Sequence, residues 1–247
     1  METADEKFHP ADYIISTIHP NRLLEMLDTR MIRPAFRNRI QSIPQTAGGF
    51  ALYVKFKENS LPYMNTNLYA YKGLSPWNCE HYKGPEWPKG HLYMHMCHED
   101  KAEFARSGVV LSYMNFDEVA QWKGSKIGRR GADYEEFKRE HAERLIAEVE
   151  KHSPGFRDSI EAYWTSTPLT YLDYTGTEDG SMYGIAKDIN LEPAGRVPYK
   201  TKIPNLLLAG QNVNSHGMLG VIVGTIVTCS ELVPADIIYK QIEESCR

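Results

Sequence analysis

The fold is decided by residues 203–225, which read Ile203-Pro-Asn-Leu-Leu-Leu-Ala-Gly-Gln-Asn-Val-Asn-Ser-His-Gly-Met-Leu-Gly-Val-Ile-Val-Gly-Thr225. Pro204-Asn205 is typical of a turn, the run from Leu206 to Ala209 is apolar, and Gly210 ends it. A polar loop follows, and an apolar helix is predicted to begin near Met218. Free N–H groups and the helix dipole would face this loop, so the segment is suited to an anionic or hydrogen-bond-accepting ligand.

This segment resembles the C-terminal flavin-binding motif of the FAD-dependent carotenoid and retinoid oxidoreductases, which include phytoene desaturases, carotenoid isomerases and retinol saturases. Two further segments resemble the same family, Ser166–Gly184 (STPLTYLDYTGTEDGSMYG) and Ala11–Pro20 (ADYIISTIHP). The resemblance implies FAD as the cofactor and an apolar, isoprenoid-like small molecule as the substrate. The flavin contacts that it implies are Gly210, Gln211, Asn212, Val213, Gly217, Met218, Leu219, Gly220, Val221 and Ile222.

The family's G-x-G-x-x-G turn, which carries the dinucleotide pyrophosphate, does not occur in this sequence. Gly48-Gly49 is the nearest candidate, but the alternating run from Phe50 to Phe56 after it predicts a strand rather than a helix. We therefore expect the C-terminal part of a flavoenzyme without its main FAD cradle, which does not retain FAD alone. A separate chain would supply the Rossmann half, or a homodimer would cover the apolar surface that the missing strands leave.

The predicted fold class is α+β. The resemblance assigns residues 1–45 and 176–247 to a partial, α/β FAD-binding domain, and residues 46–175 to a mixed-sheet substrate domain with helices on one face. Hydrophobic periodicity predicts strands over 11–18, 50–56, 68–71, 91–97, 109–114, 160–164 and 206–209, and helices over 20–27, 33–40, 116–122 and 133–151.

Composition narrows the functional classes. The sequence is 42% hydrophobic and 24% charged with a net charge of −4, which is ordinary for a soluble globular protein and argues against a nucleic-acid binder. Four scattered cysteines without a C-x-x-C pair indicate a reducing, cytoplasmic compartment. The polar start of the chain is not a signal peptide, and the apolar run 218–227 is too short to span a membrane. Peripheral membrane contact stays compatible with the sequence.

Several polar and aromatic side chains are candidates for a site. His91, His95 and Cys97 would share one strand face, but no second ligand pair accompanies them, so a polar strand face is the favoured interpretation and no metal is predicted. His216, in the loop before the predicted helix, is the one catalytic candidate, and a hydrogen bond to the loop backbone explains it equally well. Tyr174 and Tyr183 are the candidates for lining a substrate groove, although aromatic residues also fill ordinary cores.

Two functional hypotheses follow. In the first, the chain belongs to a flavin-dependent oxidoreductase that desaturates, saturates or isomerises a polyene or similar lipid, with the cofactor carrying the electrons. In the second, it is a non-enzymatic remnant or lipid-binding module that keeps the substrate domain without holding FAD.

Overall fold

The chain forms two compact units in the computed structural model, which describes residues 2–3, 5–99, 102–191 and 195–246. The central unit comprises residues 47–182, and the terminal unit comprises residues 1–46 and 183–247. The sequence placed these boundaries after residues 45 and 175. The division therefore runs through the same two regions, and the roles assigned to the two parts remain predictions.

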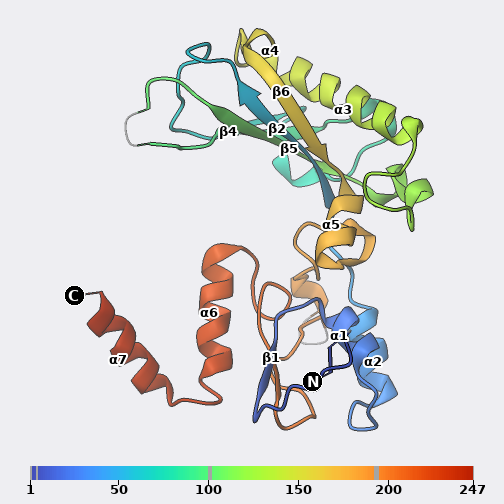
Figure 1. Ribbon diagram of the computed structural model, residues 1–247, viewed down its shortest axis with the longest axis vertical. Helices are drawn as coiled ribbons and strands as arrows, with labels where there is room; N and C mark the ends of the chain where they lie inside the picture. Colours follow the sequence, from blue (N-terminus) through green and yellow to red (C-terminus); the bar gives the residue numbers. More distant parts are fainter. Residues whose placement is uncertain (1, 4, 100–101, 192–194, 247) are drawn as a thin grey trace. The chain divides into compact units, whose positions relative to one another are not determined.

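The central unit is built on a five-stranded sheet with strand order β3-β4-β5-β2-β6, in which neighbouring strands pair antiparallel (Figure 1). The strands are β2 (Gly48–Phe56), β3 (Leu68–Tyr71), β4 (Gly90–His95), β5 (Ser107–Met114) and β6 (Ile160–Ser166). The sequence predicted all five of these strands. Gly48 and Gly49 lie within β2, as the alternation after them indicated.

The core of the central unit forms where helix α3 (Ala132–Glu150) packs on this sheet. Phe50, Leu52, Val54 and Phe56 of β2 are buried because alternate residues of a strand share one face. Leu145 and Val149 of α3 are buried in the same cluster, one helical turn apart. The helix predicted over 133–151 is confirmed, and the fold class is α+β.

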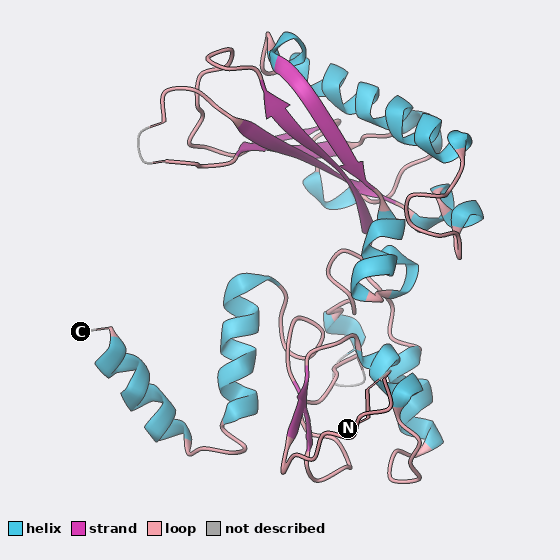
Figure 2. Ribbon diagram, viewed as in Figure 1, coloured by secondary structure: helices cyan, strands magenta, loops and turns pink. Residues whose placement is uncertain are grey.

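The terminal unit contains a two-stranded parallel sheet of β1 (Ile14–Ser16) and β7 (Leu206–Leu208), with Ile14 opposite Leu206. Helices α1 (Pro20–Met26) and α2 (Pro34–Gln41) begin at prolines, which suit the first helical turn, as the sequence indicated. Helices α6 (Gly217–Cys229) and α7 (Ala235–Ser245) end the chain (Figure 2). A small core gathers residues of α1, α2, β7 and the connecting loops and consists of Leu24, Ile32, Ile40, Ile43, Ile185, Val197, Leu208 and Val213.

Some predicted elements are wrong in extent or kind. The strand expected over 11–18 is shorter and half-exposed, because β1 pairs only with β7 among the described strands, and Ile15 is exposed. The helix expected over 116–122 is two 3₁₀ turns, Phe116–Glu118 and Ala120–Trp122. Asn115 does not cap them with its side chain, and the Glu118 carboxylate bonds to Tyr82 instead.

Three helices had not been predicted, α4 (Phe156–Ser159), α5 (Pro168–Thr175) and α7. The signal for α5 is present in the sequence, because Thr167 caps its first turn, Pro168 follows at the first position, and Gly176 ends it in the left-handed conformation. Asp173 therefore lies on a helix, where it pairs with Arg130, whose side chain is buried.

Helices α6 and α7 leave apolar side chains exposed. Met218, Leu219 and Ile222 are exposed on α6, and none of the residues of α7 is buried. Over the described residues, no helix combines the length and apolar character that crossing a bilayer requires.

Candidate functional site

The segment 209–217 joins β7 to α6 by a loop with a glycine near each end. Gly210 has φ 94° and Gly217 has φ 75°, a left-handed conformation that residues with a Cβ rarely adopt. The chain therefore changes direction at Gly210 after the strand and at Gly217 before the helix, and glycine suits both positions. His216 precedes the helix without capping it through its side chain, so the first-turn N–H groups of α6 receive no such hydrogen bond.

Two further glycines let α6 lie against this loop. A Cβ on Gly220 would approach the Ser215 carbonyl carbon to 2.8 Å, and one on Gly224 would approach the Asn214 Cβ to 3.2 Å. One turn further, the Thr228 hydroxyl donates to the Leu208 carbonyl oxygen over 2.9 Å. The Gly220–Gly224 spacing thus serves packing of the helix on its own strand and loop.

Asn212 anchors the middle of the loop. Its side-chain oxygen accepts a hydrogen bond of 2.9 Å from the Ile185 N–H, and its carbonyl oxygen accepts one of 2.5 Å from Lys187 Nζ. A Cβ on Gly184, where φ is 74°, would lie 2.0 Å from that same side-chain oxygen. The segment 184–187 and the loop therefore hold each other in a single arrangement.

His216 fixes the end of the loop. Its Nε2 lies 2.9 Å from the Ile185 carbonyl oxygen, which can only accept, so Nε2 carries the proton. The ring stacks on Tyr183 with centroids 5.7 Å apart. Burial lowers the pKa of the imidazole, the bond to Ile185 opposes this effect, and the Lys187 charge adds to it. These contacts match the backbone-anchoring role that the sequence left open beside catalysis.

The ten residues implied in flavin contact differ in their exposure. Asn212 and Val213 are buried, and Gly220 faces Ser215, so these three shape the loop from within. Met218 and Leu219 are 83% and 74% exposed, which leaves them free to contact a ligand. The others are Gly210, Gln211, Gly217, Val221 and Ile222, of which Gly217 and Ile222 are exposed.

Comparison with known proteins tests the resemblance. The chain is 27% identical over 148 residues to the all-trans-retinol 13,14-reductase of Homo sapiens and 28% identical to that of Rattus norvegicus, each match covering 59% of this chain and 24% of the relative. The reductase of Danio rerio is 28% identical over 127 residues. The chain is related to the all-trans-retinol 13,14-reductases. No family model matches it.

This similarity to retinol reductases bears out the resemblance that the sequence showed. The chain spans about a quarter of the length of these relatives, since the matches cover 24% of each. A crystal structure of an oxidoreductase from Methanosarcina mazei matches 92% of this chain and 44% of its own, with a TM-score of 0.54 and 13% identity. This second likeness concerns the fold.

The residues at the start of α6 fit a flavin of the kind that the family implies. A Cβ on Gly217 would meet no atom within 4 Å, so the space beside the first turn is open. Uncapped N–H groups stabilise negative charge at a helix start, and the exposed Met218 and Leu219 side chains offer apolar contact to a ring. When bound, a flavin would supply two-electron redox chemistry.

The two tyrosines predicted to line a substrate groove belong to different units. Tyr174 lies on α5 in the central unit and is 73% exposed. Tyr183 lies in the terminal unit, where it stacks on His216. Their proposed role in substrate binding stays a prediction.

The two histidines of strand β4 differ, because both ring nitrogens of His95 have partners whereas Nε2 of His91 has none among the described residues. His95 Nδ1 accepts from the Met64 N–H over 2.9 Å, and Nε2 lies 2.5 Å from the Tyr93 hydroxyl. His91 is buried, and this burial is the main cause that lowers its pKa to about 4. The nearby His152 lowers the pKa of His91 further. Within the described ranges, no three His, Cys, Asp or Glu side chains converge as metal ligands.

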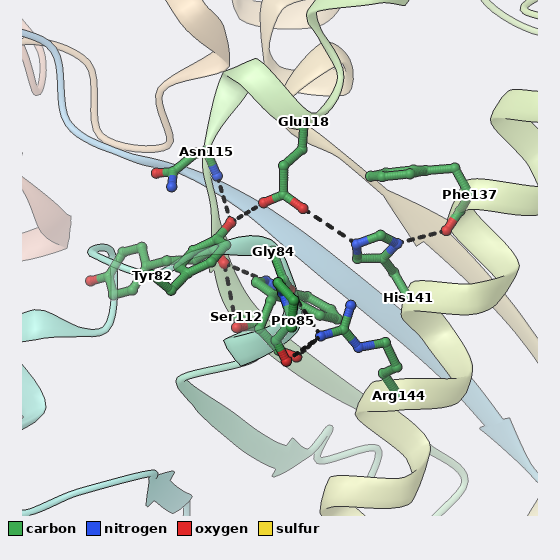
Figure 3. A network of polar contacts seen from close by, with 11 residues as sticks. Tyr82, Gly84, Pro85, Ser112, Asn115, Glu118, Phe137, His141 and Arg144 are labelled. Carbon is green, nitrogen blue, oxygen red and sulfur yellow. Dashed lines mark hydrogen bonds and ion pairs between the residues drawn. The ribbon is translucent and has the colours of Figure 1, made fainter.

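A second polar network, which the sequence did not reveal, lies in the central unit (Figure 3). The Tyr82 hydroxyl accepts from the Asn115 N–H over 2.9 Å and donates to Glu118, whose other oxygen lies 3.5 Å from His141 Nε2. His141 Nδ1 lies 2.8 Å from the Phe137 carbonyl oxygen, so Nδ1 carries a proton.

The surroundings of this network show what it does for the fold. Burial and the Glu118 contact raise the pKa of Tyr82, so its hydroxyl stays protonated. Arg144 donates to the Gly84, Pro85 and Trp87 carbonyls, not to Glu140 as the helical spacing suggests. The network thus ties α3 to the loops around Tyr82 and Glu118, which is a structural role.

Proposed function

We propose that this chain contributes the flavin-contacting loop and the substrate-binding part of an FAD-dependent oxidoreductase acting on an apolar, isoprenoid-like substrate. The observation that carries the proposal is the loop 210–217. Gly210 and Gly217, both in the left-handed conformation, and the hydrogen bond of Asn212 fix this loop beside the first turn of α6, which has no side-chain cap. The chain that contains it is similar to retinol reductases. Desaturation, saturation or isomerisation of a polyene is the reaction class.

The terminal unit would position the cofactor. N–H groups of the first turn of α6 would stabilise negative charge on the ring without moving, because the Gly217 turn fixes their direction. Met218 and Leu219 would cover one side and exclude water. His216, held by Ile185, would orient the loop, with Nδ1 as its remaining acceptor.

The chain alone is proposed not to retain FAD, since the pyrophosphate contacts of the family come from the absent G-x-G-x-x-G turn. A few loop hydrogen bonds, each about 0.5–1.5 kcal/mol net, do not replace them. The purified chain should therefore be colourless. Near-stoichiometric flavin absorption would contradict this part of the proposal.

A segment graft tests the loop itself. Residues 203–225 of this chain would replace the corresponding segment of human all-trans-retinol 13,14-reductase, and the FAD content of the purified chimera would be measured. We expect FAD to be retained, and to be lost in a matched graft with Gly217→Val, since a β-branched residue does not tolerate φ 75°.

The result decides between the two hypotheses. A folded chimera that lacks FAD, or one that keeps FAD with Gly217→Val, would refute the assignment of this segment. Saturable quenching of tryptophan fluorescence by all-trans-retinol in the chain alone, together with a failed graft, would favour the lipid-binding module.

A further inference from the structure

A basic loop in the central unit joins the 3₁₀ turn Ala120–Trp122 to helix α3. It comprises residues 123–131 and reads KGSKIGRRG, with four cationic side chains and no carboxylate. The whole chain has a net charge of −4, so this loop stands out from its surroundings by its charge. A segment of this kind is suited to an anionic partner.

Both ends of the loop are fixed to the core of the central unit. Trp122, just before the loop, is buried; its Nε1 donates to Asp133 over 2.8 Å and its ring packs on Tyr134 with centroids 5.1 Å apart. At the other end, the buried side chain of Arg130 pairs with Asp173 and lies over the ring of Tyr134. The tip of the loop therefore projects from an anchored base.

The tip is a tight turn over residues 126–129. The Arg129 N–H donates to the Lys126 carbonyl oxygen over 3.0 Å, and Gly128 has φ 73°, which favours glycine at the third position of such a turn. Ile127, at the corner of the turn, is 56% exposed, and Lys126 and Arg129 on either side of it are exposed as well. The turn thus presents one apolar side chain between two cations.

The charges of the tip are not compensated within the chain. The amine of Lys123 lies 4.0 Å from a carboxylate oxygen of Asp179, and Arg130 is paired as described above. Among the described residues, no ion pair or hydrogen bond engages the side chains of Lys126 and Arg129. Two positive charges at the tip are therefore left for a partner.

We propose that the tip of this loop docks on an anionic membrane surface. Lysine and arginine attract negative headgroups, and an apolar side chain between them enters the boundary between headgroups and acyl chains. A site for single-stranded nucleic acid would present aromatic side chains on which bases stack, and residues 123–131 contain none. The proposal does not rest on the flavin assignment, because the implied flavin contacts belong to the terminal unit.

The test is flotation of the full chain with vesicles of equal parts of phosphatidylcholine and phosphatidylserine. We expect binding that weakens at higher salt and is much weaker on pure phosphatidylcholine. Lys126→Gln and Arg129→Gln should each reduce the affinity about fivefold, and the double variant at least about tenfold. Lys83→Gln is the matched control, because Lys83 is an exposed lysine of the same unit outside the loop. Circular dichroism confirms that each variant is folded.

Ile127 gives a readout that does not depend on charge. Ile127→Asn should weaken binding to the anionic vesicles although the net charge stays the same. In Ile127→Trp, brominated acyl chains in the same vesicles should quench the tryptophan fluorescence more than they quench that of the wild type. Such quenching places the tip, rather than another part of the chain, at the membrane.

The outcomes separate the membrane from other partners. Binding to the anionic vesicles that the double variant loses and Lys83→Gln keeps supports the proposal. No binding to vesicles, binding that the double variant retains, or no added quenching in Ile127→Trp overturns it. Binding to soluble polyuridylate without binding to vesicles identifies a nucleic-acid site instead, and also overturns it.

Discussion

Replacing Gly220 by alanine should destabilise the terminal unit, although alanine is the better helix former. Alanine in a helix interior gains about 0.8–1.0 kcal/mol over glycine. At this position its Cβ would lie 2.7 Å from the Ser215 Cβ, 2.8 Å from the carbonyl carbon and 2.9 Å from the oxygen. Two of these atoms belong to the backbone, so the loop itself must move.

The balance of these effects sets the expected magnitude. Overpacking costs about 1–3 kcal/mol, and a backbone neighbour places this case at the upper end. The net loss for Gly220→Ala is then about 1–2 kcal/mol. Gly224→Ala is the matched control on the same helix, since its Cβ would meet only side-chain atoms of Asn214, the Cβ at 3.2 Å and Nδ2 at 3.9 Å. Its stability should stay within about 1 kcal/mol of the wild type.

The distribution of tryptophan makes the assay specific to the terminal unit. All four tryptophans, Trp77, Trp87, Trp122 and Trp164, lie in the central unit. Urea unfolding followed by far-ultraviolet circular dichroism should therefore show the loss in Gly220→Ala, while tryptophan fluorescence stays near the wild-type curve. Equal or greater stability of Gly220→Ala than of Gly224→Ala would refute the packing argument.

The same geometry changes how a bulkier substitution is interpreted. Gly220→Val would be expected to abolish flavin retention, but the contact that it breaks first is the one with Ser215. Loss of flavin in that variant would therefore not identify a cofactor contact. The exposed Met218 and Leu219 are better probes of the ligand face.

Three further predictions concern the rest of the chain. Glu118→Gln should lower the stability of the central unit by about 1–3 kcal/mol, because the half-buried Tyr82 hydroxyl loses its charged acceptor; tryptophan-detected urea unfolding measures this, and an unchanged midpoint would contradict the role of the network. In the folded state the pKa of His91 is lowered to about 4, so His91 contributes stability that is present above its unfolded pKa of about 6.5 and is lost as the pH falls from 6.5 to 4. His91→Leu should therefore reduce the slope of the stability curve in this pH range. An unchanged slope in the variant would show that His91 does not cause the loss of stability at acid pH. The exposed apolar side chains of α6 should drive self-association, so light scattering should show a dimer that Ile222→Glu dissociates, whereas a clean monomer of the unmodified chain at high concentration would count against it.

Local patterns in the sequence were sufficient for much of the fold. The alternation through β2 placed Phe50 and Leu52 inside, and the helical period placed Leu145 and Val149 on the buried face of α3. The turn, apolar run and glycines of residues 203–225 predicted β7, the loop and α6, and they carried the family resemblance as well. Each of these patterns depends on residues that are close together in the chain, so a single sequence is enough to detect it.

The tertiary structure alone decided which polar groups meet. Asn212 reaches Ile185, Glu118 reaches Tyr82 and His141, and Lys187 comes beside Arg196, Asn214 and Ser215. The residues in these pairs are not separated by a helical or strand repeat, so hydrophobic periodicity does not predict their contacts. The close approach of Gly220 to Ser215 was also invisible in the sequence, because a missing side chain has the same signature whether it faces a ligand or its own loop. The position of Ser215 in space shows that Gly220 packs on its own loop, and its role in flavin contact stays a prediction.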